Sequence, residues 1–301
     1  MKVFLKNVFL FVFPLLLLGF GSEVLIRKIP NDYLYKKESL DKCAKNIEVL
    51  FLGNSHFFYG VNPAFIQKKS FNAACASQSL NFDFEIMKKY QNDFKNLKYI
   101  VLPIDYLSLF TTIEKSKENW RVKNYNLYFD INYNYALEDN SELFSNNLKT
   151  NFKKLKYYYI KKQNTLTTTS LGWGNGFDSK NNQDLIKSGK ESAIRHRSDD
   201  VDIFNQNIVI LKSIVEFAKT NHIQLLLISS PVYKTYIDNL NPYQMNKTIQ
   251  VAKDLDERYK NVKYINWMNN KAFVKSDFYD ADHLNNIGAE KLSKKLNYFL
   301  N

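Results

Sequence analysis

The segment from Glu48 to His56 constrains the fold of this chain more than any other. It reads Glu-Val-Leu-Phe-Leu-Gly-Asn-Ser-His, a short apolar run that ends at a Gly-Asn-Ser turn. An apolar run of this length, bounded by a turn, is typical of a buried strand in a parallel sheet. Ligands of open α/β sheets bind beyond the carboxyl ends of such strands. We therefore expect Ser55 at a functional edge, on a turn where Gly53 permits tight backbone geometry.

A serine at this place is a useful nucleophile only if a base can reach it, and the chain holds four histidines. His283 is the strongest candidate because Asp280 precedes it by three residues, just before a C-terminal helix. At this spacing Asp280 can accept a hydrogen bond from one ring nitrogen, which leaves the other nitrogen to take the proton of Ser55. Asp282 is adjacent to His283, so its side chain is expected to point elsewhere, and Asp277 is a more distant alternative.

The other three histidines are weaker candidates for the base. His56 follows Ser55 directly, and adjacent side chains on a turn rarely align for proton transfer. We interpret His56 as a loop residue or a substrate contact. His196 and His222 look incidental, and His222 ends a predicted helix, where the helix dipole favours a histidine.

Strands and helices are predicted to alternate along much of the chain. We expect strands at residues 47–52, 70–74, 98–104, 223–230 and 262–267, a loop at 56–62, and helices at 38–45, 63–69, 80–94, 201–220, 241–259 and 285–300. Such alternation indicates an α/β fold of three layers, with helices on both faces of a parallel sheet. Residues 107–200 interrupt the alternation and are predicted to form a helical or irregular insertion.

The N-terminal segment is predicted to enter a membrane. Two lysines precede an uncharged run from Val8 to Phe20, which extends to Ile26 if Glu23 is tolerated. A helix of about 20 residues spans the roughly 30 Å hydrocarbon core, and a proline is tolerated within it. We favour an uncleaved signal anchor, and a cleaved signal peptide is the alternative. Residues 1–28 would form this helix, 29–46 a connection and 47–301 the main domain, which in both cases lies outside the cytoplasm.

Composition adds weaker constraints. The net charge of +12 comes mainly from scattered lysines, which we interpret as a solvated surface, with attraction to anionic polysaccharide or lipid headgroups as the alternative. No nucleic-acid-binding motif accompanies the charge, so no nucleic-acid partner is expected. Cys43 and Cys75 either pair in an oxidising compartment or serve as small apolar core residues. Neither cysteine lies in a metal-binding pattern, and no metal or organic cofactor is predicted.

The two ends of the chain resemble the SGNH (GDSL-type) hydrolase superfamily. Gly53-Asn54-Ser55 is similar to its first block, and Asp280 to His283, followed by Leu284, Gly288 and Ala289, is similar to its last. The resemblance covers about residues 47–104 and 223–300. It implies a flavodoxin-like parallel sheet and serine-dependent acyl chemistry. The overall layout is closest to membrane-anchored members that act on cell-envelope polymers.

The middle blocks of the superfamily are altered, which leaves the oxyanion donors open. The second block usually supplies a backbone N–H from a glycine, and the corresponding loop here is Ala76-Ser77-Gln78, for which an ordinary helix cap is the alternative. The third block, Gly-x-Asn-Asp, is absent. Asp105 stands near its place, but an ionised carboxylate would repel an oxyanion, so Tyr106 or Ser108 is the candidate donor.

The insertion is predicted to wall the active site. It is rich in tyrosine, asparagine and lysine, and aromatic faces suit sugar rings whereas arginine suits carboxylate or phosphate. The candidate substrate contacts, for which packing or surface charge is the alternative role, are Trp120, Arg121, Trp173 and the run Arg195-His196-Arg197.

Together these features predict an O-acyl, most simply O-acetyl, esterase or acyltransferase acting on a cell-envelope carbohydrate. Expected partners are an acylated carbohydrate or cell-surface polymer, the membrane through the N-terminal helix, and polysaccharide-modification machinery. Hydrolysis and transfer share one acyl-enzyme, so the sequence does not separate them. The alternatives are an SGNH-like scaffold that binds polysaccharide without catalysis, and an esterase of phospholipids or lipoproteins.

Overall fold

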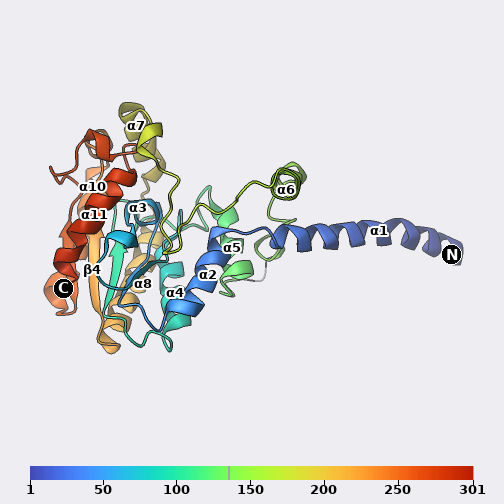
Figure 1. The fold of residues 1–301 in the computed structure, drawn as a ribbon, viewed down its shortest axis with the longest axis horizontal. Helices are drawn as coiled ribbons and strands as arrows, with labels where there is room; N and C mark the ends of the chain where they lie inside the picture. The colour runs from blue at the N-terminus through green and yellow to red at the C-terminus, as the bar shows by residue number, and fades with distance from the viewer. Residues whose placement is uncertain (135, 301) are drawn as a thin grey trace. The chain divides into compact units, whose positions relative to one another are not determined.

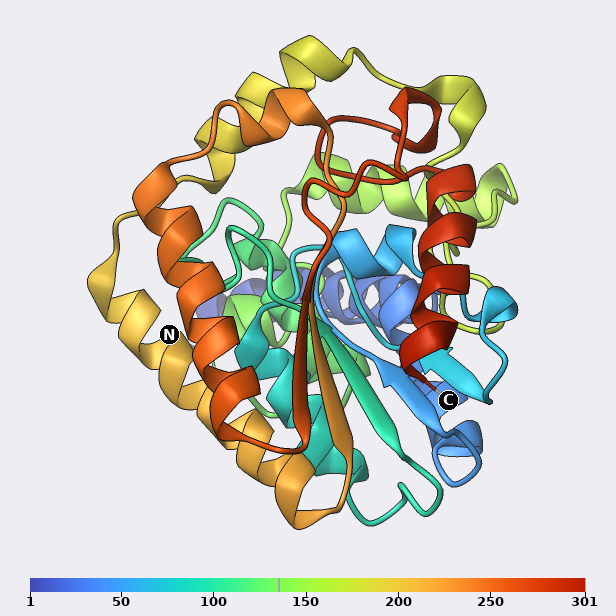
Figure 2. The same cartoon turned by 90° about the vertical axis from the view of Figure 1, so that its left-hand side faces the viewer.

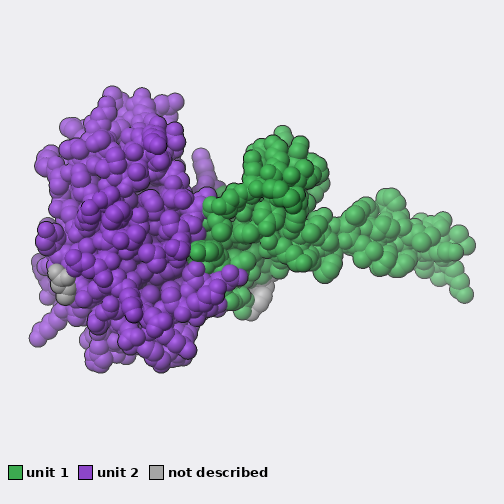
Figure 3. Space-filling view, in the orientation of Figure 1, with its two compact units in different colours: residues 1–37, 119–166 green, residues 38–118, 167–301 purple. Residues whose placement is uncertain are grey.

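A computed structural model describes residues 1–134 and 136–300 (Figure 1). Tyr135, inside the predicted insertion, and Asn301, the last residue of the predicted main domain, lie outside the described residues. The chain forms two compact units: unit 1 comprises residues 1–37 and 119–166, and unit 2 comprises residues 38–118 and 167–301 (Figure 3). These units divide the chain at different places from the domains predicted from the sequence, and the predicted boundaries stay predictions.

Unit 2 contains a parallel sheet of five strands in the order β2-β1-β3-β4-β5. The strands are β1 (Val49–Phe51), β2 (Ser70–Asn72), β3 (Tyr99–Pro103), β4 (Gln224–Ser229) and β5 (Val262–Asn266). The predicted α/β class and parallel sheet are therefore confirmed. In the register of the sheet, Leu50 of β1 pairs with Phe71 of β2 on one side and with Ile100 of β3 on the other. The order reverses at β1, and that reversal is where doubly wound sheets bind ligands.

Helices cover both faces of this sheet (Figure 2). The longer helices of unit 2 are α4 (Leu80–Tyr90), α7 (Leu185–His196), α8 (Val201–Thr220), α10 (Pro242–Arg258) and α11 (Asn286–Leu296), and its short helices are α3 (Ser55–Gly60) and α9 (Lys234–Ile237). α4 contacts α8, and α11 contacts α3. Figure 2 shows α8 and α10 on one face and α11 on the other, so the sheet is the middle of three layers.

Two sequence predictions around β1 are wrong. The expected loop at residues 56–62 is largely the helix α3, because the side chain of Asn54 accepts the N–H of His56 at 2.9 Å and starts a helix there. The expected helix at 63–69 is only a 3₁₀ turn, Pro63–Phe65. The chain then stays extended, since the carbonyl of Lys69 accepts the N–H groups of Glu48 and Val49 beside β1.

Unit 1 is helical. It contains α1 (Lys2–Arg27), the 3₁₀ turns at Asn119–Arg121 and Leu137–Asp139, α5 (Val122–Tyr128), α6 (Leu148–Leu155) and a π turn at Lys156–Ile160. α2 (Asp32–Cys43) crosses the boundary between the units. Further 3₁₀ turns in unit 2 are Ser179–Asn181, Lys275–Asp277 and Asn297–Phe299.

The predicted N-terminal apolar helix is present. α1 is long and apolar enough to cross a membrane, and a signal sequence would share these features. Its side chains from Val3 to Phe20 are almost all exposed, whereas Ile26 is buried. At its last turns Glu23 accepts hydrogen bonds from the backbone N–H groups of Glu142 and Leu143, so this end of α1 is fastened within unit 1.

Cys43 and Cys75 are both free, which agrees with their interpretation as core residues rather than a disulfide. Cys75 is buried and Cys43 is partly buried.

Replacing Gly53 by alanine is expected to lower the free energy of unfolding by about 2–4 kcal/mol. Gly53 has a φ of +107°, and a Cβ at this position would lie 2.2 Å from Cγ of Pro103. Gly176→Ala is the matched control, because its Cβ would meet only Tyr59, at 3.8 Å. Chemical denaturation of the full chain in detergent measures both. Equal stability of the two variants would contradict the expectation.

Candidate active site

Ser55 is placed by the end of strand β1. Gly53 turns the chain after the strand, and its N–H donates to the carboxylate of Asp83 at 2.7 Å. Asn54 then caps α3, and Ser55 is the first residue of that helix. Ser55 therefore lies beyond the carboxyl end of β1, at the point where the strand order reverses.

The loop between Phe278 and Leu284 places His283 and Asp280. Phe278 and Leu284, at the two ends of the loop, form an antiparallel bridge. The N–H of Tyr279 donates to the carbonyl of His283 at 3.0 Å. Inside the loop, Oδ1 of Asp280 accepts the N–H of His283 at 2.8 Å, so the carboxylate is held by the backbone of the residue that it orients.

Three predicted residues meet at this edge of the sheet. Nε2 of His283 lies 2.8 Å from Oγ of Ser55. Nδ1 of His283 lies 2.9 Å and 3.1 Å from the two carboxylate oxygens of Asp280. Since Asp280 accepts the proton on Nδ1, Nε2 is left as the acceptor for the serine hydroxyl. Asp277, the distant alternative, instead pairs with Lys291 at 2.5 Å.

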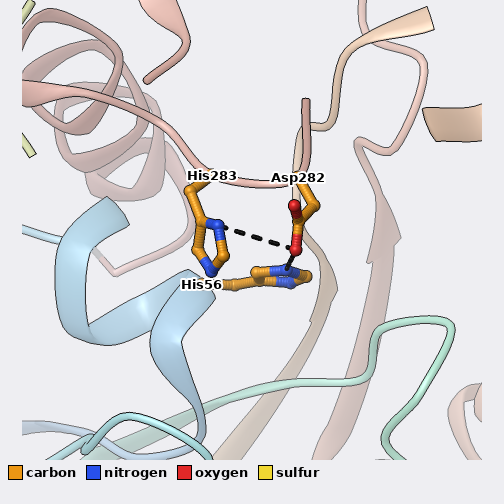
Figure 4. A group of neighbouring side chains, drawn as sticks. All are labelled: His56, Asp282 and His283. Carbon is orange, nitrogen blue, oxygen red and sulfur yellow. Dashed lines mark ion pairs between the residues drawn. The ribbon is translucent and has the colours of Figure 1, made fainter. Parts of the chain in front are cut away.

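A second buried pair lies beside these groups. Nδ1 of His56 lies 2.7 Å from Oδ2 of Asp105, whose Oδ1 accepts the N–H of Ser230 at 2.7 Å. Asp282 points between the two imidazoles, as Figure 4 shows, and its Oδ2 lies 3.7 Å from Nε2 of His56 and 3.5 Å from Nδ1 of His283. The expectation that Asp282 points elsewhere is therefore wrong.

Charge explains this arrangement. Burial by itself lowers the pKa of His56, but the charges of Asp105 and Asp282 and the hydrogen bonds to them outweigh it and raise the pKa to about 10. Burial by itself raises the pKa of Asp282, but the neighbouring histidines hold it well below its ordinary value. His56 is thus an imidazolium between two carboxylates. It is almost fully buried, so its prediction as a substrate contact or loop residue is corrected to an internal charge partner.

His196 also belongs to this cluster and is not incidental. Its Nδ1 contacts the hydroxyl of Tyr236 at 2.8 Å and lies 3.9 Å from Oδ2 of Asp282. Burial lowers the pKa of His196 to about 3, so this ring stays neutral. The guanidinium of Arg195, predicted as a substrate contact, lies 3.7 Å from the same oxygen.

His56, Asp282 and His283 bring three possible metal-ligand atoms within 4.8 Å of one another. A metal ion there would have to displace the second proton of His56 and compete with Asp280 for Nδ1 of His283. As they stand, His56 and His283 are hydrogen-bonded to Asp105 and Asp280, and Asp282 contacts both rings only at ion-pair distance. The prediction that the chemistry needs no metal stays a prediction.

The loop predicted to hold the oxyanion lies beside Gly53, since the N–H of Cys75 donates to the Gly53 carbonyl at 3.1 Å. Ser77 has a φ of +61°, so it adopts the left-handed conformation that glycine favours. Among the described residues, the N–H groups of Ser55, Ala76 and Ser77 have no hydrogen-bond acceptor. These three donors therefore agree with the predicted oxyanion role, which stays a prediction.

The side chains of three other oxyanion candidates are engaged elsewhere. The side-chain amide of Gln78 donates to Asp83 at 2.6 Å, and burial raises the pKa of Asp83 to about 7. Tyr106 is buried, and its hydroxyl accepts the N–H of Asn241 at 3.1 Å. Ser108, the alternative to Tyr106, accepts the N–H of Asp105 at 2.9 Å. These contacts give the side chains of Gln78, Tyr106 and Ser108 structural roles.

The predicted tryptophan and arginine contacts lie in different units. Trp120 and Arg121 belong to unit 1, where they line a cavity. Trp173 belongs to unit 2, and its indole N–H donates to the carbonyl of Tyr59 at 2.7 Å. Their contact with a substrate stays a prediction.

An aromatic stack beside His283 was missed from the sequence. Tyr59 stacks on Phe177 with ring centroids 3.7 Å apart, and Phe177 stacks on Tyr279 at 4.0 Å. Phe177 also meets the ring of His283 edge to face, at 5.2 Å. All three aromatic residues are partly exposed. Tyr59 and Tyr279 each lie four residues from a member of the predicted triad, which is the signal that could have identified them.

Comparison with known proteins gives structural likeness only. No family model and no curated protein sequence matches the chain. Similar solved structures include a protein provisionally described as a platelet activating factor from Streptococcus pneumoniae, with 13% identity, a TM-score of 0.45, and coverage of 97% of this chain and 99% of that chain. Another is provisionally described as an acylhydrolase from Bacteroides fragilis, with 12% identity, a TM-score of 0.35, and coverage of 84% and 88%.

A third similar structure is a GDSL-like lipase from Bacteroides thetaiotaomicron, with 10% identity, a TM-score of 0.41, and coverage of 89% of this chain and 98% of that chain. At these identities and TM-scores, an assignment of function depends on the geometry of the site.

Replacing His56 by glutamine is expected to destabilise the chain most below pH 6.5. The folded-state pKa of about 10 lies above the ordinary value of about 6.5, so the stabilisation is complete below pH 6.5 and is lost as the pH rises through 10. We expect a loss of about 3–5 kcal/mol at pH 6.5, since Asp105 loses its hydrogen-bonded cation and Asp282 loses one of its cationic neighbours. Tm is measured for the variant and for wild type at several pH values between 6 and 10, and the difference in Tm between the two proteins is followed as a function of pH.

Other groups titrate in both proteins, so that difference isolates His56. The exposed His222 provides the control variant, His222→Asn, which is expected to leave Tm nearly unchanged. A difference for His56→Gln that stays constant across this pH range would contradict the assigned imidazolium.

Proposed function

We propose that this chain is a serine esterase or acyltransferase of the SGNH (GDSL-type) superfamily, acting on O-acyl groups of a cell-envelope carbohydrate outside the cytoplasm. The observation that carries the proposal is the hydrogen-bonded series Ser55–His283–Asp280, with 2.8 Å between Oγ and Nε2 and 2.9 Å between Nδ1 and Oδ1. Both distances suit proton transfer and orientation without movement of the backbone.

In the proposed mechanism Ser55 attacks the ester carbonyl while His283 takes the hydroxyl proton. The tetrahedral intermediate collapses as the bond to the carbohydrate oxygen breaks, and His283 returns the proton to that oxygen. Water, or a second sugar hydroxyl, then attacks the acyl-serine by the same steps in reverse order. Asp280 stays ionised and stabilises the imidazolium that forms at His283.

The oxyanion of each intermediate would be held by backbone donors. The N–H of Ser55 lies at the first position of α3, where helical N–H groups have no partner within the helix. The N–H groups of Ala76 and Ser77 come from the adjacent loop. These three backbone donors would take the place of the asparagine block, and each oxyanion donor is worth about 10²–10³ in rate.

Three features support a carbohydrate substrate at a cell surface. The stack of Tyr59, Phe177 and Tyr279 provides an aromatic surface next to His283, which suits the apolar face of a sugar ring. α1 has the length and composition of a membrane anchor. The net charge of +12 adds attraction for acidic polymers.

Activity of the full chain in detergent toward an activated acetyl ester tests the serine and the base. Ser55→Ala and His283→Ala are expected to abolish turnover, and Asp280→Asn to lower it by about 10⁴ because the tautomer of His283 is no longer fixed. Ser213→Ala, which removes an exposed hydroxyl on α8, is the control and should retain full activity. The full chain is used because a truncation after Pro30 would remove part of unit 1.

Turnover that persists in Ser55→Ala would refute the proposed nucleophile. No turnover in wild type, together with no labelling of Ser55 by a serine-directed phosphonate, would favour the non-catalytic scaffold. Adding an acetylated oligosaccharide donor and an unacetylated acceptor, and following acetate release against acceptor acetylation, separates hydrolysis from transfer.

Tyr279→Ala is expected to raise KM for an O-acetylated oligosaccharide by about tenfold, since an exposed aromatic face is lost. It should leave kcat/KM for the small activated ester within about twofold. Tyr298→Ala is the matched control, because Tyr298 is exposed at the far end of α11. An equal loss with both substrates would show that Tyr279 supports the position of His283 and does not bind sugar.

A further inference from the structure

Unit 1 contains a cavity of about 390 Å³ whose lining includes none of Ser55, His283 and Asp280. Its walls come from the end of α1, the turn that follows, the first residues of α2, α5, α6 and Tyr157, and every lining residue belongs to unit 1. Sites for small ligands commonly have volumes of about 300–1,000 Å³, so the cavity is large enough to hold one.

The lining carries an excess of positive charge. It holds four cationic side chains (Arg121, Lys123, Lys153 and Lys154) and two acidic ones (Asp32 and Glu142), which gives 4 − 2 = +2. Glu142 is shared: its Oε1 lies 2.5 Å from Nζ of Lys123 and its Oε2 lies 2.8 Å from Nζ of Lys154. Glu142 thus contacts two ammonium groups at once, and the net positive charge of the lining favours an anion.

The buried member of this group is Lys123. Its side chain is only 1% exposed, and the hydroxyl of Tyr128 competes for its partner by donating to Glu142 at 2.9 Å. Burial lowers the pKa of Lys123 to about 8, although the charge of Glu142 acts in the opposite direction. A cation that has already lost its hydration gains more from a bound anion than an exposed lysine does.

The remainder of the lining is apolar or aromatic. Ile26, Ile29 and Pro30 contribute from the end of α1 and its turn. The guanidinium of Arg121 lies 4.4 Å from the ring centroid of Trp120, so the aromatic and cationic groups adjoin each other. Such a lining suits a ligand with an anionic group next to hydrocarbon.

The elements around the cavity suit a membrane surface. The run of exposed apolar side chains that begins at Val3 in α1 extends to Phe20. At a rise of 1.5 Å per residue, Phe20 lies about 9 Å along the helix from Ile26, which lines the cavity. The polar interfacial layer of a bilayer is about 5–8 Å thick on each side. If the exposed run occupies the hydrocarbon core, Ile26 lies at the outer boundary of this layer, so the cavity borders the lipid headgroups.

α6 adds a second, independent feature of an interfacial element. Leu148 and Phe152, four residues apart and so on one face of the helix, are 80% and 68% exposed. Phe144 just before the helix is exposed as well, and α6 carries lysines at positions 149, 153 and 154. Helices with exposed large apolar side chains and a lysine-rich face lie in membrane interfaces, and α6 contacts α1.

We propose that the unit 1 cavity binds the headgroup phosphate of an anionic phospholipid, with the first part of an acyl chain against Ile26 and Ile29. Lys154 and Arg121 contact the phosphate, and α6 lies in the interface with Leu148 and Phe152 among the lipids. This binding is separate from acyl transfer at Ser55 and fixes unit 1 to the membrane surface.

The test uses the full chain in neutral detergent and phosphatidylglycerol brominated on its acyl chains, which quenches nearby tryptophan fluorescence. The chain has three tryptophans, and of these only Trp120 lines the cavity. The difference in quenching between wild type and Trp120→Phe therefore measures lipid bound at the cavity. We expect half-maximal quenching at an about tenfold lower mole fraction of brominated phosphatidylglycerol than of brominated phosphatidylcholine.

Lys154→Gln and Lys149→Gln form a matched pair, because both remove one charge from α6 but only Lys154 lines the cavity. Lys154→Gln should abolish most of the preference for phosphatidylglycerol, and Lys149→Gln should retain it. Turnover of the activated ester should be unchanged in both, which separates this proposal from the one for Ser55.

Equal quenching by the two lipids, or an equal effect of the two lysine variants, would overturn the proposal. Either result would show that the lipid is attracted only by the general surface charge. Competition by glycerol 3-phosphate at the same concentration as the lipid would show that the acyl chain is not recognised, and it would also overturn the assignment to a lipid.

Discussion

The hydrogen bond between Ser55 and His283 joins residues 228 positions apart, and the rest of unit 2 is needed to form it. Parallel strands place their carboxyl ends at one edge, so β1 brings Ser55 to the edge that β5 reaches just before the His283 loop. The loop is fixed in turn by Asn285, whose side chain donates to the Ser276 carbonyl at 2.8 Å and caps α11. A displacement of about 1 Å at either end would break the contact.

Burying charge at this edge imposes a second constraint. Asp105 and Asp282 are almost fully buried, and each needs a positive partner because an unpaired buried carboxylate is strongly destabilising. His56 serves both. Asp282 lies 3.5 Å from Nδ1 of His283, and His56 balances its charge. Asp280 is then the carboxylate that is hydrogen-bonded to Nδ1 of His283. Asp105 is thus engaged by a buried histidine.

Unit 1 is held together by different interactions. It has no strand among its described residues, and its structure is organised around the last turns of α1, where Glu23 accepts backbone N–H groups of Glu142 and Leu143. Lysine and tyrosine side chains that look like scattered surface residues in the sequence gather there around one carboxylate, Glu142. A small part of the charge excess of the whole chain therefore lies in the lining of one cavity.

The sequence by itself determined the elements whose signal is local. The apolar run before Gly53, the Asp280–His283 spacing and the uncharged N-terminal run each depend on a few neighbouring residues, and they predicted the parallel sheet, the three residues that meet at its edge and α1. Prediction of the helix at 63–69 was wrong because pairing of the Lys69 carbonyl beside β1 overrides local propensity.

Only the tertiary structure decided the roles of residues whose partners are distant. His56 looked like a loop residue because Asp105, 49 positions away, is invisible as its partner until β1 and β3 pair. The stack of Tyr59, Phe177 and Tyr279, the engagement of Gln78 by Asp83 and the cavity in unit 1 depend likewise on contacts across the fold. Burial and charge pairing are properties of the packed chain, and no short stretch of sequence contains them.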